Sequence, residues 1–316
     1  MGGSAISSDD MKRHYDARSY SSAVNASQIF TSKKMLDDFN PATMKLPREA
    51  CDSALSPRSR AIIFAEDVTG SMGSFLLSLI QNEFPRLINE TYKCTSYNPH
   101  IMFMGVGDVA AGDRAPLQVT QFETDLRMLD QLEKIYLEKG GGGNRYESYI
   151  LPWYFASKYT KIDCFEKRGE KGFLFTFGDE EPTPRLKKNE LDTVFGGRDD
   201  FEGKSLTGAD CLEMASKMYY CYHIILHGNG YGRLNLDQWS VLMDGHACDL
   251  RDHTCLPELV TTILRMYEGY SKSDCINQIG NSHTRKVVQE ALVAHEETVE
   301  ISSPEEPAES TKIEVF

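Results

Sequence analysis

Residues 59 to 74 read Ser-Arg-Ala-Ile-Ile-Phe-Ala-Glu-Asp-Val-Thr-Gly-Ser-Met-Gly-Ser. The run from Ala61 to Ala65 contains no polar residue, which is typical of a strand buried on both faces of a parallel sheet. Two carboxylates and a glycine-containing turn follow it directly. In open α/β sheets, ligands bind beyond the carboxyl ends of the strands, where the strand order reverses. We therefore expect Asp67 to lie at a binding crevice.

The spacing Asp67-x-Thr69-x-Ser71 places one carboxylate and two hydroxyls at alternate positions of a tight loop. Three oxygen ligands within so short a loop suit Mg²⁺, a small hard cation that takes oxygens in octahedral geometry and keeps several waters. The same run is also typical of an aspartate-initiated turn in which one of these side chains caps the helix that begins near Met72. The pattern by itself leaves both interpretations open.

Further strand and helix signals alternate along the chain, as in a doubly wound α/β fold. Apolar strands are expected at 61–66, 100–106, 172–177, 222–226 and 246–250, and an edge strand at 117–122. Amphipathic helices are expected at about 72–87, 124–136, 149–159, 207–218, 237–243 and 256–267. With right-handed crossovers, the sequence predicts a six-stranded sheet in the spatial order 3-2-1-4-5-6, in which only the edge strand is antiparallel.

A run of glycines, Gly140 to Gly143, precedes Asn144-Arg145-Tyr146-Glu147-Ser148 and a predicted helix. Because glycine takes positive φ values freely, such a backbone can approach a ligand closely. A phosphate-binding loop is the competing interpretation, but no strand precedes the run and no Gly-Lys-Ser/Thr ending follows it.

Together these features resemble the von Willebrand factor A (vWA) domain and its metal-ion-dependent adhesion site (MIDAS), over about residues 60 to 270. The first metal loop of that family reads Asp-x-Ser-x-Ser, and Thr69 takes the place of the middle serine. Its second loop reads Gly-Gly-Thr before a helix, which aligns Asn144 with the threonine, while Glu147 or Ser148 could take the position instead. Its third loop reads Thr-Asp-Gly-Glu-Pro, where this chain has Gly-Asp179-Glu-Glu-Pro.

The resemblance implies a Rossmann-like vWA fold and a metal-dependent protein-binding module. The implied ligands of Mg²⁺, or of Mn²⁺ or Ca²⁺ in its place, are Asp67, Thr69, Ser71, Asn144, Glu147 and Asp179. The ion would complete its coordination with a carboxylate of a partner protein, in the assembly or remodelling of a complex that includes an AAA+ ATPase. Independently of the resemblance, Asp108, at the end of the strand 100–106, is a candidate to support the ligands without touching the ion, although an aspartate that forms a turn after Gly107 is the commoner interpretation.

Two other functional classes stay open. A metal-free vWA-like scaffold would account for Glu66, Asn144 and Glu180, which depart from the family pattern. A Mg²⁺-dependent phosphohydrolase resembling the haloacid dehalogenase superfamily would also carry an aspartate after its first strand. The phosphatases of that superfamily have Asp-x-Asp, and Thr69 in the second position donates a proton less readily than an aspartic acid.

The 8 cysteines include no Cys-x-x-Cys pair, which is typical of thiols in a reducing compartment rather than of a disulfide framework. A His-x-Cys-x4-His-x-Cys pattern, formed by His246, Cys248, His253 and Cys255, has the residue types of a zinc site. A strand followed by a turn would point these side chains in different directions, so the pattern is only a weak indication of zinc.

Composition and charge bound the remaining possibilities. A chain of 316 residues with 41% hydrophobic content can bury a sizeable core, and its net charge of -13 argues against nucleic acid or an anionic membrane as partner. No apolar run approaches the ~18 residues that cross a membrane, and the polar start does not resemble a signal peptide, so we expect a cytoplasmic protein. We expect an irregular N-terminal extension at 1–57, the vWA-like domain at 58–272, a C-terminal helix at 273–296 and an acidic disordered tail at 297–316.

Overall fold

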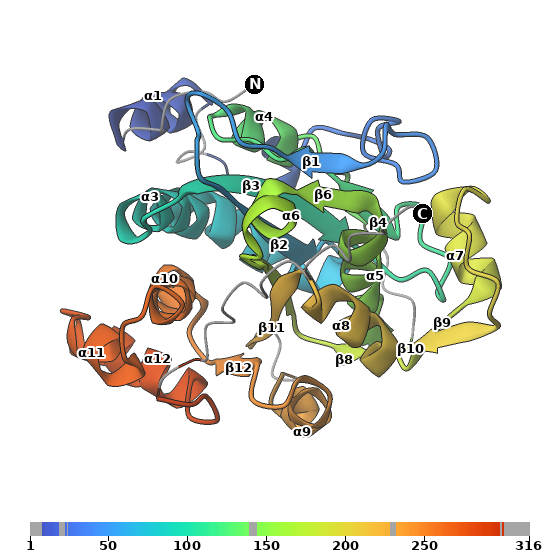
Figure 1. The fold of residues 1–316 in the computed structure, drawn as a ribbon. Helices are drawn as coiled ribbons and strands as arrows, with labels where there is room; N and C mark the ends of the chain where they lie inside the picture. The colour runs from blue at the N-terminus through green and yellow to red at the C-terminus, as the bar shows by residue number, and fades with distance from the viewer. Residues whose placement is uncertain are drawn as a thin grey trace, which may run out of the picture.

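A six-stranded sheet forms the centre of the computed structural model, which describes residues 8–18, 23, 25–138, 144–227, 232–297 and 299. In the order β12-β11-β7-β2-β3-β4, every neighbouring pair is parallel except β3 and β4. The strands are β2 (Ser59–Asp67), β3 (Asn98–Val106), β4 (Leu117–Val119), β7 (Gly172–Gly178), β11 (Tyr219–Leu226) and β12 (Ala247–Leu250). The prediction of a mostly parallel, Rossmann-like α/β sheet with an antiparallel edge strand is confirmed (Figure 1).

Strand β2 lies inside the sheet, and its side chains alternate between the two faces. Its register pairs Phe64 with Phe103 of β3 and with Phe175 of β7. Phe64 belongs to one buried hydrophobic cluster and Ile63 to the other, on the opposite face. Each large apolar side chain buried in this way contributes roughly 1.5–3 kcal/mol, which explains why this run contains no polar residue.

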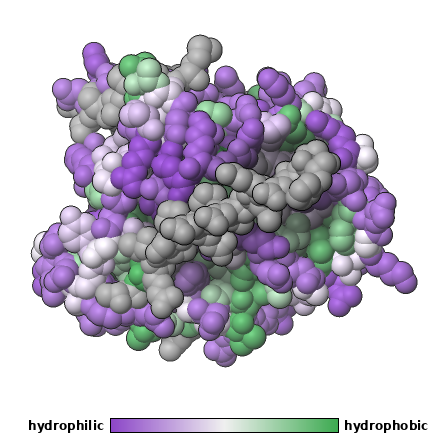
Figure 2. Space-filling view, viewed as in Figure 1, coloured by the Kyte–Doolittle hydropathy of each residue, from purple (hydrophilic) through white to green (hydrophobic). Residues whose placement is uncertain are grey.

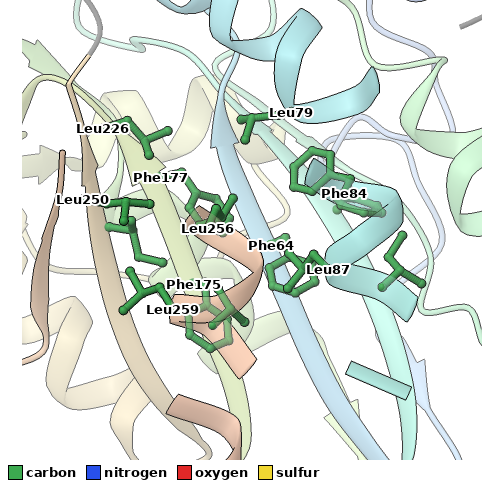
Figure 3. Close-up of a cluster of buried hydrophobic side chains, with 14 of the residues drawn as sticks. Phe64, Leu79, Phe84, Leu87, Phe175, Phe177, Leu226, Leu250, Leu256 and Leu259 are labelled. Carbon is green, nitrogen blue, oxygen red and sulfur yellow. The ribbon is translucent and has the colours of Figure 1, made fainter. Parts of the chain in front are cut away.

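The face of the sheet on which Phe64 lies, called the first face below, is covered by α3, α10 and α12, together with the helical turns before α3. These elements are α2 (Gly73–Ser78), a π-helical turn η4 (Leu79–Glu83), α3 (Phe84–Cys94), α10 (Leu256–Met266) and α12 (Ser282–Ala291). Figure 3 shows part of this layer, with the labelled side chains Phe64, Phe175, Phe177, Leu79, Phe84, Leu87, Leu256 and Leu259 packed together. The single helix expected at about 72–87 is divided because Pro85 has no amide N–H to donate to the preceding turn.

The second face is covered by the helices that follow the glycine run. They are α5 (Ile150–Tyr159), α6 (Asp163–Arg168), α7 (Lys188–Phe195), α8 (Gly208–Ser216) and α9 (Gly232–Met243). Trp239 of α9 stacks against His223 of β11 and meets Trp153 of α5 edge to face. This aromatic packing fixes α5, and with it the loop that precedes the helix.

Two predicted elements are much shorter than expected, and the C-terminal helix predicted at 273–296 is divided into α11 (Lys272–Asn277) and α12 (Ser282–Ala291). The edge strand β4 ends at Val119 because the hydroxyl of Thr120 accepts the Phe103 N–H (2.9 Å) in place of a backbone carbonyl. The helix expected at 124–136 is confined to α4 (Arg127–Leu132), whose N-cap is Leu126 rather than Thr124. Its apolar residues are nevertheless buried on the first face.

The N-terminal segment lies over the edge of the sheet. Ile29 and Phe30 are buried in the first cluster. The Val119 N–H of β4 donates to the Phe39 carbonyl (2.9 Å), and the Arg48 guanidinium donates to the Val119 carbonyl (3.2 Å). Backbone groups of the edge strand that would otherwise be free to pair with another chain are thereby used.

Several short elements complete the described chain. They are α1 (Ser8–Arg18), η2 (Ala26–Gln28), β1 (Arg48–Ala50), η3 (Gly70–Met72), β5 (Tyr146–Glu147), β6 (Thr160–Ile162), β8 (Glu181–Pro182), β9 (Arg185–Lys187), β10 (Ser205–Thr207), η5 (His253–Cys255) and α11 (Lys272–Asn277). Strands β1 and β6 pair in parallel, as do β5 and β8, whereas β9 and β10 are antiparallel. The expected tail at 297–316 falls mostly outside the described residues.

The visible surface is mostly hydrophilic, with hydrophobic residues in small separate groups (Figure 2). The large hydrophobic side chains exposed in the described part of the chain are Leu55, Val241, Tyr270 and Val293. Within that same part, no helix is both long and apolar enough to span a bilayer.

Candidate metal centre

Three neighbouring strands of the sheet end in buried aspartates. Asp67 is the last residue of β2, Asp179 follows β7 directly, and Asp108 follows β3 after one intervening residue. Their exposed fractions are 0%, 2% and 1%. Carboxylates are rarely buried so fully, so three of them at the carboxyl ends of neighbouring strands make this end of the sheet chemically unusual. The structure thus brings Asp67 and Asp179 to the same end of two adjacent parallel strands.

The loop after β2 folds around the Asp67 carboxylate. Its Oδ1 accepts the Thr69 N–H (2.8 Å) and the Thr69 hydroxyl (2.6 Å), which is an aspartate-initiated turn. The N-cap of α2 is Met72, and no side-chain hydrogen bond caps that helix. Asp67 therefore organises the turn without capping the helix. Ser71 lies in η3, and its side chain is outside the described part of the chain.

The second loop is held beside the third by a short parallel ladder. Strands β5 and β8 pair Tyr146 with Glu181 and Glu147 with Pro182. The Thr183 hydroxyl donates to the Glu147 carbonyl (2.6 Å). The glycines 140–143 lie outside the described residues. Glu147 is thereby placed next to the loop that carries Asp179.

Asp108 anchors the second loop rather than facing the first. The Asn144 amide donates to its Oδ2, and the Ser148 hydroxyl lies 3.4 Å from its Oδ1. The Ser148 hydroxyl also accepts the Val109 N–H (3.0 Å). Two of the three residues considered for the second metal loop are therefore bonded to Asp108. The third, Glu147, is 5% exposed, and its Oε2 has no hydrogen-bond partner in the described structure.

Burial and mutual repulsion shift the pKa values of these acids. Burial, reinforced by the charge of Asp179 and opposed by the Thr69 and Tyr149 hydrogen bonds, raises the pKa of Asp67 to about 7. Burial, followed by the charge of Asp67, raises the pKa of Glu147 to about 10. The charged neighbours with the largest influence on Glu147 are all carboxylates. The ionised forms of these acids are therefore disfavoured, and a bound cation would stabilise them.

Tyr149 contacts the centre, although no pattern in the sequence indicates this role. Its hydroxyl donates to Asp67 Oδ2 (2.8 Å) and lies 3.4 Å from the Glu180 N–H. The ring occupies space that Gly178 leaves open, since a Cβ at Gly178 would lie 1.9 Å from the Tyr149 hydroxyl. The ring of His223 packs edge to face against it, at 5.0 Å between centroids. The one related feature of the sequence is Gly178, which ends an apolar strand and leaves room for a large side chain, but it does not identify Tyr149.

Gly178→Ala is expected to destabilise the protein by about 1–3 kcal/mol, because the methyl group would displace Tyr149 from Asp67. Denaturant unfolding of the purified protein measures this loss. Gly280→Ala is the matched control, since no atom lies within 4 Å of a Cβ at that position. Equal stability of the two variants would contradict the close packing of Tyr149 on β7.

The four residues of the His-x-Cys-x4-His-x-Cys pattern do not converge, so this zinc interpretation is wrong. His246 Nδ1 bonds to the Cys221 carbonyl (3.0 Å), and His253 Nε2 bonds to the Ser78 hydroxyl (2.9 Å). Cys248 is fully buried in β12, in the hydrophobic cluster of the first face. A strand followed by a turn points these side chains apart.

Two other groups of three potential metal ligands occur in the described part of the chain. They are Asp252 with Cys255 and His283, and His14 with Asp130 and Glu133, and within each group the ligand atoms lie within 4.8 Å of one another. Asp67 belongs to neither group. An ion at Asp67 would consequently depend on hydroxyl and water oxygens as well as on carboxylates.

No family model matches this chain, and no curated protein matches it. Among solved structures, it is similar to two crystal structures of the pilus adhesin SpaC from Lactobacillus rhamnosus GG, one of them in an open conformation. Both have a TM-score of 0.40 and 10% sequence identity, over 76% of this chain and 31% or 32% of the adhesin chain. This chain therefore spans about a third of the length of those adhesins.

Proposed function

We propose that this chain is a vWA-like protein-binding module that holds a divalent cation at Asp67 and binds its partner through that cation. The observation that carries the proposal is the buried, acid-rich centre in which Glu147 Oε2 has no partner. Buried like charges are tolerated when the groups are protonated or when a cation neutralises them. The sheet order β4-β3-β2-β7-β11-β12 supports the proposal, because it is the order that the vWA resemblance implies.

Mg²⁺ is the proposed ion, with Mn²⁺ and Ca²⁺ as alternatives, because every candidate ligand is an oxygen. Asp67, Thr69 and Ser71 would supply the first loop, and Asp179 the third. For the second loop we favour Glu147 over Asn144, because the Asn144 Oδ1 already accepts the Tyr146 N–H (3.1 Å) while its N–H₂ group donates to Asp108. Glu147 also interacts electrostatically with Asp67.

The proposed partner presents an aspartate or a glutamate. An ion held by a few carboxylates and neutral hydroxyls keeps a position for another oxygen ligand. Assembly or remodelling of a complex beside an AAA+ ATPase is the setting that the vWA resemblance suggests. We do not propose phosphate-ester hydrolysis, because the position of the expected general acid is occupied by Thr69, whose hydroxyl donates to Asp67.

A metal-free scaffold is the second candidate, and one observation favours it. Both oxygens of Asp67 already accept hydrogen bonds, Oδ1 from Thr69 and Oδ2 from Tyr149. In that case the hydrogen bonds, together with a proton shared among the acids, would stabilise the centre. The two candidates differ in whether adding a divalent cation changes the protein.

Cation binding is expected to strengthen as the pH rises from 6 to 8. The ion binds ionised carboxylates, and Asp67 with a pKa of about 7 loses its proton in this range. The proton that Asp67 releases should by itself increase the affinity by up to about tenfold per pH unit below that pKa, and ligation by Glu147 would add the effect of a second proton. Calorimetric titration with MgCl₂ at several pH values measures this. An affinity that does not change with pH would contradict ligation by Asp67.

The number of protons released at pH 8 distinguishes the two candidates for the second loop. At that pH Asp67 is mostly ionised, whereas Glu147, with a pKa of about 10, still holds its proton. Ligation by Glu147 should release about one proton per ion, and Glu147→Gln should abolish this release. Titrations in two buffers of different ionisation enthalpy give the count. Unchanged release in Glu147→Gln would assign the second loop to another residue.

A further inference from the structure

A second cluster of chemically different ligands lies at the far edge of the sheet. After β12 the chain forms η5 (His253–Cys255), which Asp252 caps by accepting the Thr254 N–H (3.0 Å). The start of α12 packs against this turn and brings His283 to it. The ligand atoms of Asp252, Cys255 and His283 all lie within 4.8 Å of one another.

One ligand of the cluster is buried, and the other two are accessible to solvent. Cys255 is 1% exposed, whereas the side chains of Asp252 and His283 are 31% and 66% exposed. Asp252 Oδ1 is fixed by the N–H and the hydroxyl of Thr254, at 3.0 and 2.7 Å. Its Oδ2 therefore faces His283 Nε2, at 2.7 Å. An ion could enter from solvent and find two of its ligands already oriented.

We propose that Asp252, Cys255 and His283 bind a Zn²⁺ ion. Thiolate sulfur, imidazole nitrogen and carboxylate oxygen are the ligands that zinc takes in proteins, and three protein ligands leave a fourth position for water. At metal–ligand distances of about 2.0–2.3 Å, the ligand atoms of a tetrahedral ion lie about 3.5 Å apart, so small side-chain rotations complete the site.

The ligand types separate this site from the one proposed at Asp67. Mg²⁺ takes oxygen ligands, whereas a thiolate selects a softer ion. Only Cys255 belongs to the four-residue pattern in the sequence, because the other two ligands come from the helix cap and from α12. This proposal does not rest on the function proposed above.

Carboxylates predominate around this place, and Arg86, which donates to the Thr254 carbonyl (3.1 Å), pairs with two of them. Glu258 lies three residues after Cys255 in α10, and therefore on the same face of the helix. Its Oε2 is buried without a hydrogen-bond partner in the described structure, while its Oε1 pairs with Arg86. Glu83 also bonds to Arg86 (2.9 Å), so two carboxylates share this one guanidinium. The bound ion would join α12 to η5 and so fasten the C-terminal helices to the sheet.

Cobalt substitution tests the site without reference to any activity. Co²⁺ added to the metal-free, reduced full-length chain should produce a thiolate-to-cobalt charge-transfer band and the visible absorption of a tetrahedral ion. Zn²⁺ should displace the cobalt with a stoichiometry of about one per chain. Absence of the charge-transfer band in the wild-type protein would overturn the proposal.

The variants identify the ligands. His283→Ala removes a largely exposed side chain, so it should fold normally and bind Co²⁺ at least about tenfold more weakly, since loss of even an outer partner of a metal ligand costs that much. Cys255→Ser should lose the charge-transfer band. Cys51→Ser, which removes an exposed thiol, should keep both the band and the affinity. Full affinity in His283→Ala, or a band that persists in Cys255→Ser, would show that the three residues form only a hydrogen-bonded helix contact.

Discussion

Asp67→Asn is expected to lose divalent-cation binding at the first centre, with an affinity for Mg²⁺ at least about a hundredfold lower than that of the wild type. In the proposed site the carboxylate would be the charged ligand of the first loop, whereas an amide offers one neutral oxygen and brings an N–H₂ group toward the ion. Because asparagine has the same shape, it can still accept the Thr69 hydrogen bonds that hold the turn. Calorimetric titration with MgCl₂ at pH 8 measures the loss.

The same variant should be at least as stable as the wild type in chelator at pH 8. An unfolded aspartate titrates near pH 4, and folded Asp67 near 7, so between these values the folded chain retains a proton that the unfolded chain has lost. The contribution of Asp67 to stability therefore falls as the pH rises from about 4 to about 7, and stays low above that range. The neutral amide of the Asp67→Asn variant carries no charge and avoids this cost.

Asp67→Ala removes the charge together with the hydrogen-bond acceptor. It should also lose the ion, but with part of the stability gain cancelled, because the Thr69 and Tyr149 hydroxyls are left without this acceptor at a cost of about 1–3 kcal/mol. Thermal unfolding in chelator compares the three proteins. A wild-type Mg²⁺ affinity in both variants would end the cation-binding proposal.

The second large effect concerns the partner complex. This complex should dissociate when a chelator removes the ion, and it should not form with the Asp67→Asn variant. It should also depend on one aspartate or glutamate of the partner that no amide can replace. A net charge of -13 repels an acidic partner at long range. Screening beyond ~8 Å at physiological salt removes most of that repulsion, while the contact at the ion is screened much less. The affinity should therefore rise with moderate salt.

Affinity capture from the native source, with Mg²⁺ and with chelator, tests this dependence. The wild-type chain and Asp67→Asn are compared in both conditions, with Gly280→Ala as a variant that leaves the centre untouched. A complex that survives chelator and also forms with Asp67→Asn would move the assignment to the metal-free scaffold.

Much of the fold follows from local pattern. The apolar run before Asp67 predicts a strand buried on both faces, and Phe64 and Ile63 do divide between two clusters. The lengths of the helices and strands are predicted less well by the local pattern, because hydrogen bonds between distant residues determine where the elements end. Thr120 ends the edge strand by bonding to Phe103, a residue 17 positions away. Pairings of two or three residues, such as β5 with β8, are too short to leave a periodic signal.

The candidate centre was partly predictable for a different reason. Aspartates that follow apolar runs can be recognised in the sequence, so Asp67 and Asp179 could be placed together at the carboxyl ends of the strands. Which member of the second loop turns inward depends on contacts with Asp108 that sequence spacing does not encode. Tyr149 reaches Asp67 only because Gly178 leaves room for it. The ligand group at Cys255 likewise assembles from separate elements.

Anomalous diffraction from crystals grown with Mn²⁺ tests the central claim most directly. Mn²⁺ prefers oxygen ligands as Mg²⁺ does, and its anomalous signal locates it independently of any assay. We expect a single strong peak beyond the end of β2, within ligand distance of Asp67 and of a Thr69 or Ser71 hydroxyl, with a carboxylate of the second or third loop nearby. A difference map without a peak at Asp67, with the Asp67 carboxylate still bonded to Thr69 and Tyr149 at saturating Mn²⁺, would contradict it.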